Sequence, residues 1–150
     1  MSSLPGTWAD HLAYLEAEFA DAVAAPLSAR KALLCALLAD ALADRLFAAD
    51  PTTGDILEFR AALACRSPAL GHLFALAAGR SRLVTETVAV PLERYGELDV
   101  ADFMVSLYNG HTVQRVRLAL PDGGRLDIHL VLAEAIEALR ETAAPTARSD

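Results

Sequence analysis

Residues 112–130 contain the pattern that most restricts how this chain can fold. Apolar and polar side chains alternate on both sides of the loop Pro121-Asp122-Gly123, which is typical of the two strands of a β-hairpin. Proline suits the first central position of a type I turn, and glycine suits the left-handed position of a G1 bulge. The register that this loop predicts pairs the core residues Leu118 with Leu126 and Val116 with Ile128, and the outer residues Arg117 with Asp127 and Arg115 with His129.

A short helix is predicted immediately before this hairpin, over residues 99–108. Asp99 is a favourable N-cap, and Asp102 occupies the capping-box position three residues later. Asn109-Gly110 tolerates the left-handed conformation that ends many helices. Apolar residues recur in this segment at the helical period, at Val100, Phe103, Met104 and Leu107.

The chain before residue 80 has the pattern of four helices joined by short loops. Thr7 and Ser28 are N-caps of the first two helices, the third covers about residues 55–65, and Ser67-Pro68 begins the fourth. The second helix, residues 29–48, has a wide apolar stripe. We expect the first helix to turn Trp8, Leu12, Leu15, Phe19 and Val23 inward, and the second to turn Leu33, Leu34, Leu37, Leu38, Ala41, Leu42, Leu46 and Phe47 inward.

Together these segments predict an α+β fold in a single domain over residues 1–142. A four-helix N-terminal half packs on a small three-stranded antiparallel sheet, and a closing helix over residues 132–141 follows the hairpin. Residues 143–150 have no periodicity and are expected to form a frayed tail. The predicted strands lie near residues 82–90, 112–120 and 125–129.

Composition narrows the class of function. A formal net charge of −7 argues against nucleic-acid binding, because phosphate contacts need a basic face. The N-terminus lacks the basic and apolar regions of a signal peptide, and the apolar runs are too short to span a membrane. Cys35 and Cys65 are expected to be buried, reduced thiols. We therefore expect a cytoplasmic protein that binds neither nucleic acid nor membrane.

The sequence contains no motif for catalysis or cofactor binding. GxSxG, P-loop and GxGxxG patterns are absent, and the four histidines lack metal-type spacing. Asp127 and His129 could supply two metal ligands, but a tight site needs more. Glu86, Glu93 and Asp127 could perform acid–base chemistry only if the fold assembled them. Glu86 also shares a strand face with valines, which predicts an arginine partner or an open face. We expect no catalytic residue, no metal and no cofactor.

The best candidate for a binding surface is the outer face of the hairpin together with its mouth. Arginine, tyrosine and histidine are residue types that are prominent in binding surfaces. Two alternatives remain open, namely a solvated face whose ion pairs only set the register and a site for an anion or small molecule. The candidate residues are Tyr108, Asn109, His111, Arg115, Arg117, Asp127 and His129.

Two functions follow as hypotheses. The first is a small acidic accessory or regulatory protein that acts through protein–protein contact at this surface. In that case helix 29–48 is either the central helix of a monomer or the seam of a homodimer. The second is a small enzyme or small-molecule-binding protein whose pocket, between helices and sheet, holds Glu86, His111 and an arginine. A DNA-binding helix-turn-helix is disfavoured, because no helix carries a basic reading face.

Overall fold

The structure is a computed structural model that describes residues 6–51 and 54–143. Its strands form one antiparallel sheet in the order β1-β2-β3. The predicted α+β class is confirmed, with helices first, a short helix before the hairpin and a helix that closes the chain. The elements are α1 (Trp8–Ala24), α2 (Ala29–Ala49), α3 (Ile56–Arg66), α4 (Pro68–Ala77), β1 (Arg82–Ala89), the 3-10 helix η1 (Leu92–Glu97), α5 (Val100–Tyr108), β2 (Thr112–Ala119), β3 (Arg125–Asp127) and α6 (Ile128–Ala143).

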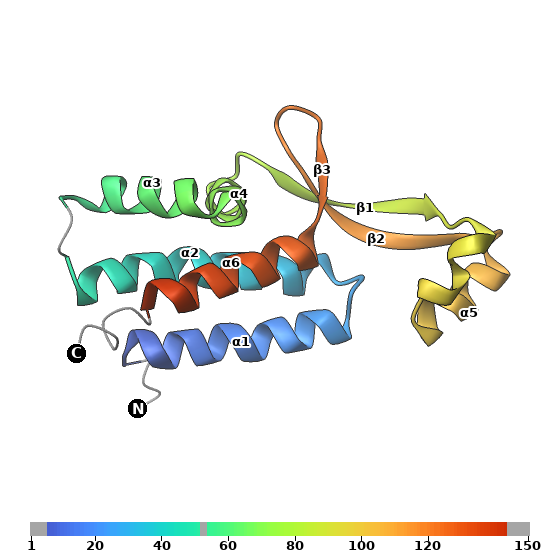
Figure 1. Cartoon of the computed structure of the whole chain (residues 1–150), viewed down its shortest axis with the longest axis horizontal. Helices are drawn as coiled ribbons and strands as arrows, with labels where there is room; N and C mark the ends of the chain where they lie inside the picture. The colour runs from blue at the N-terminus through green and yellow to red at the C-terminus, as the bar shows by residue number, and fades with distance from the viewer. Residues whose placement is uncertain (1–5, 52–53, 144–150) are drawn as a thin grey trace.

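The ribbon of the sheet projects from one end of the helical bundle (Figure 1). α2 packs against α1, α4 and α6, while α3 packs mainly on α4. β1 and β2 form a long ribbon that leaves the bundle, and η1 and α5 lie at its far end (Figure 1). We call residues 82–119 the arm, and residues 92–108, which include η1 and α5, the arm tip.

The hydrophobic core lies within the bundle and reaches only the base of the arm. Val116 and Leu118 of β2 are buried members of this core. Val90 and Val113 are also buried, but they lie in the outer part of the arm and are separate from the main cluster. The largest fully buried side chains of the bundle are Leu15, Leu42, Leu63, Leu70, Leu73, Ile128, Leu132, Ile136 and Leu139. The arm therefore depends on its own contacts to keep its tip folded.

The hairpin turn has the predicted geometry. Gly123 has a φ of 92°, and its backbone N–H donates to the Leu120 carbonyl at 3.0 Å. The Leu120 N–H donates to the Gly124 carbonyl at 2.8 Å, which closes the loop. The register near the turn is confirmed, with Leu118 opposite Leu126 and Arg117 opposite Asp127.

The second half of the predicted register is wrong, because β3 ends at Asp127. Oδ1 of Asp127 accepts hydrogen bonds from the backbone N–H groups of His129 at 2.9 Å and Leu130 at 3.4 Å. This side chain therefore acts as the N-cap of α6, which begins at Ile128. Ile128 and His129 consequently do not pair with β2, and the closing helix extends beyond residues 132–141 at both ends. The helix start was missed because polar and apolar side chains alternate over residues 125–130, which is typical of a strand.

The predicted helix starts are confirmed by their caps. Thr7 accepts from the Asp10 N–H at 3.1 Å, and Asp99 accepts from the Asp102 N–H at 2.7 Å. Ser28 and Ser67 cap α2 and α4 in the same way. Of the predicted tail, residue 143 is the last residue of α6, and residues 144–150 lie outside the described residues.

The prediction for the inward face of α2 is wrong in its first half. Leu33, Leu34, Leu37 and Ala41 are exposed. The buried face is made mostly of small residues, because Ala and Cys allow neighbouring helices to approach closely. The two faces are adjacent on the helix, and apolar periodicity does not separate them. The buried residues of α2 are Ala32, Cys35, Ala36, Ala39, Leu42, Ala43 and Leu46.

Two further burial predictions need correction. Val23 of α1 is exposed, whereas His11 and Ala22 are buried in its place. His11 Nε2 donates to the Leu38 carbonyl at 2.8 Å, so a polar side chain belongs to the α1–α2 contact. Cys65 is exposed at the end of α3, and only Cys35 is buried.

Across the described part of the chain, no helix combines the length and apolarity that a bilayer crossing requires.

Candidate functional site

The outer face of the arm carries ion pairs between neighbouring strands. Glu86 of β1 lies 3.4 Å from Arg117 Nε through one carboxylate oxygen and accepts from Arg125 Nη1 at 2.7 Å through the other. An arginine partner was predicted for Glu86 because it shares its face with valines. The structure shows two such partners, Arg117 and Arg125. These charges compensate one another across the three strands, so this part of the candidate surface is not an unpaired cationic patch.

The remaining strand candidates also have partners. Arg115 Nη2 lies 3.0 Å from Asp102 Oδ2 of α5, which ties the helix to β2. Asp127 caps α6, and its carboxylate lies 3.8 Å from His129 Nδ1. His129 Nε2 is buried without a hydrogen-bond partner among the described residues. Arg115 and Asp127 thus serve mainly to attach helices to the sheet.

The other three candidates lie at the far end of the arm. Tyr108 is 82% exposed at the C-terminal end of α5, and Asn109 is the C-cap residue of that helix. His111 follows with a φ of 65°, and its Nδ1 is hydrogen-bonded to the Tyr95 hydroxyl of η1. The seven predicted residues are therefore divided among the far end of the arm, the middle of the ribbon and the start of α6.

The arm tip exposes an apolar surface that sequence analysis did not predict. Val100 is 81% exposed and Met104 is 46% exposed, although the apolar residues of α5 recur at the helical period. Exposed apolar residues that gather on one element are typical of interaction sites, whereas single ones are ordinary. The available signal was that α5 has apolar residues around most of its circumference. The large apolar residues exposed on the arm tip are Leu92, Val100, Phe103, Met104, Val105, Leu107 and Tyr108.

The exposure of these residues does not result from a loosely attached helix. The Tyr95 ring contacts the Phe103 ring edge to face, with 5.5 Å between centroids. Ser106 is fully buried and its hydroxyl donates to the Phe103 carbonyl at 2.9 Å, while the His111 N–H donates to the Ser106 carbonyl at 2.9 Å. The ion pair between Asp102 and Arg115 of β2 and the ring contact with Tyr95 of η1 therefore hold α5 in place and leave its apolar side chains available.

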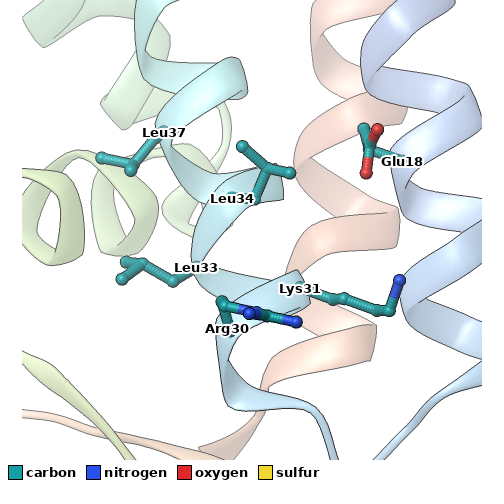
Figure 2. A pocket seen from close by; sticks show the side chains of 6 residues that line it. All are labelled: Glu18, Arg30, Lys31, Leu33, Leu34 and Leu37. Carbon is teal, nitrogen blue, oxygen red and sulfur yellow. The ribbon is translucent and has the colours of Figure 1, made fainter.

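A second apolar surface lies on α2 in the bundle (Figure 2). It is a hollow of about 480 Å³, here called the α2 groove. The cations stand at the N-terminal end of α2, and the leucines follow along the helix (Figure 2). Its lining residues are Arg30, Lys31, Leu33, Leu34 and Leu37 of α2 and Glu18 of α1.

Two smaller hollows lie beside the arm. One of about 420 Å³ separates the start of α2 from β1, and one of about 280 Å³ lies between the α1–α2 loop and α5. Glu86 and His111 line neither of these hollows, nor the α2 groove. Within the described residues, no cluster of three or more His, Cys, Asp or Glu side chains could hold a metal ion.

The chain was compared with models of protein families, with curated proteins and with solved structures. None matches.

Proposed function

We propose that this chain is a small cytoplasmic accessory or regulatory protein that acts through protein–protein contact, and that the arm tip is its contact element. The observation that carries the proposal is the exposed apolar surface of α5, on a helix that polar contacts hold in place. Burial of this surface by a partner removes apolar area from water, which is the main favourable term in protein association.

The charges of the arm tip define the chemistry of the partner. Glu93, Glu97 and Asp99 are exposed beside the apolar residues, and Arg94 is the one basic residue of the tip. Charge complementarity steers association and excludes like-charged partners. The partner surface is therefore an apolar groove with basic residues at one end.

This proposal moves the contact away from the hairpin face. Arg115 and Arg117 are committed to carboxylates of their own chain at 3.0 and 3.4 Å, so a partner that used them would have to break these pairs. The α5 side chains need no such rearrangement, because they already face solvent.

The placement of Glu86 and His111 gives no support to a pocket enzyme. The Val90 N–H donates to the His111 carbonyl at 2.6 Å, so His111 stands beside Val90. Val90 is four residues from Glu86, a distance of about 13 Å along a strand. The two side chains that the pocket hypothesis required are thus at separate places on the arm.

The test is native mass spectrometry of protein purified gently from its own host. We expect the wild-type chain to carry a second polypeptide and the double variant Met104→Asp, Leu107→Asp to lose it with the fold retained by circular dichroism. Leu57→Asp is the matched control, because Leu57 is 74% exposed on α3. A wild-type chain without any bound polypeptide, or a double variant that keeps it, would contradict the proposal.

A further inference from the structure

The partner chemistry proposed above is present on this chain itself. The α2 groove combines exposed leucines with Arg30 and Lys31 at one end, and Glu18 of α1 is the one carboxylate of its lining, so the lining carries more positive than negative charge (Figure 2). Two cations in the first turn of a helix oppose its dipole, so they do not assist the formation of α2. Among the described residues, neither side chain forms an ion pair within 4.0 Å. Both cations remain available to an acidic partner.

The α2 groove and α5 have the same spacing of apolar residues. Leu33, Leu34 and Leu37 stand at positions i, i+1 and i+4 of α2, and Phe103, Met104 and Leu107 stand at the same positions of α5. In α2 the charged residues before this triplet are the basic Arg30 and Lys31. Before the triplet of α5 they are acidic, namely Glu97 at the end of η1, Asp99 at the N-cap of α5 and Asp102 in its first turn. Two helices that lie side by side in the same direction, with these triplets in contact, therefore bring opposite charges together.

The helical parts of the two elements have similar lengths. From Arg30 to Leu37 the helix rises about 10 Å, and from Asp99, the N-cap of α5, to Leu107 it rises about 12 Å, at 1.5 Å per residue. α5 of the same chain is held on β2 by the 3.0 Å ion pair between Asp102 and Arg115. The helix that enters the groove must therefore come from another molecule.

We infer that the partner of the arm tip is a second copy of this chain, with α5 of each protomer in the α2 groove of the other. A twofold axis makes this exchange reciprocal, so one dimer contains two identical tip–groove contacts. The inference rests on the proposed function and names its partner.

The test mixes two variants, each defective in one half of the contact. Met104→Glu disables the tip and Leu34→Glu disables the groove, and both positions are exposed, so the fold tolerates the change. Sedimentation velocity on the purified chain should show a wild-type dimer and, for each variant alone, dimerisation weakened by at least about tenfold, because an unpaired charge is buried. An equimolar mixture should regain dimer, since it restores one intact contact of two.

A charge reversal provides the second measurement. Lys31→Glu should weaken the dimer, and adding Glu97→Lys on the same chain should restore it. Leu57→Glu is the control that should dimerise like wild type. A wild-type chain that stays monomeric at every accessible concentration would overturn the inference, as would single variants that dimerise normally or a mixture that regains nothing. A monomer that binds a different protein through its tip would overturn this inference but leave the proposed function intact, whereas a monomer with no partner would overturn both.

Discussion

Glu86 shows how one residue organises the sheet. It stands on β1 between Val84 and Val88 of the same face, where an isolated carboxylate would be unfavourable. Its side chain is 27% exposed and bridges Arg117 of β2 and Arg125 beside the hairpin turn. Glu86 thus links its own strand, β1, to both β2 and β3 through charge.

Glu86→Gln should lower the free energy of unfolding by about 0.5–1 kcal/mol, the size usual for partly exposed ion pairs. The loss should shrink at high salt, because salt screens such pairs. Urea unfolding at two ionic strengths measures it, with Glu134→Gln on the exposed side of α6 as the control. A loss that does not depend on salt would show that Glu86 acts through packing.

The two cysteines differ in environment and therefore in reactivity. Burial raises the pKa of the Cys35 thiol to about 11, with a smaller contribution from the Glu18 carboxylate. Since the neutral thiol is favoured in the fold, this contribution to stability is complete below the ordinary thiol pKa and is lost as pH rises through about 11. Cys65 is exposed and has no such protection.

A disulfide reagent at neutral pH should therefore label one thiol quickly in the native chain and the second only on unfolding. Mass spectrometry of the labelled peptides should assign the fast thiol to Cys65. Cys65→Ser should abolish the fast phase. Rapid labelling of Cys35 in the native chain would contradict its burial.

Among the elements, α2 has two distinct apolar faces. Leu42 is fully buried against the other helices, whereas Leu37 lies in the exposed α2 groove. Leu42→Ala should lower the free energy of unfolding by about 2–4 kcal/mol because it leaves a cavity. Leu37→Ala should leave the stability of the monomer nearly unchanged. Urea unfolding at low protein concentration tests both, and equal losses would contradict the assignment of faces.

The start of α6 depends on one side chain. Asp127→Ala removes the acceptor for the N–H groups of His129 and Leu130 and should cost about 1 kcal/mol of unfolding free energy. Asp127→Asn keeps an acceptor and should stay close to wild type in the same urea titration. If Asn were as damaging as Ala, the carboxylate charge would be the important property.

Local chemistry explains which elements could be predicted from the sequence. Helix caps and the hairpin turn depend on a few adjacent residues, so Thr7, Asp99 and Gly123 were identified correctly. The end of β3 was missed, because the cap formed by Asp127 and the alternation of the following residues give opposite signals. The helix start prevails here because α6 can then extend into the core. The pattern of residues 125–130 does not show this advantage.

At the scale of the whole molecule, the sequence could not show which apolar faces are covered by other elements, although inward residues such as Leu15, Leu42 and Leu118 were predicted correctly. Apolar periodicity indicates which residues share a face but not what covers that face, so the exposed leucines of α2 were expected inside. The ribbon carries α5 beyond the end of the bundle (Figure 1). In α2, small residues take the place of the leucines in the core. The sequence candidate at Tyr108 lies within the resulting apolar surface, whereas Arg115 and Arg117 serve structure.

The most direct test of the central claim is a photo-crosslinking residue placed at Tyr108 on the arm tip in the living host. The same residue at Leu57, on α3 of the bundle, is the control. We expect a discrete adduct to one polypeptide from position 108 and not from position 57, and peptide mapping should place the crosslink in a groove that is apolar with basic residues at one end. Equal, diffuse adducts at both positions, or none at position 108, would contradict the account of the arm tip as a contact element.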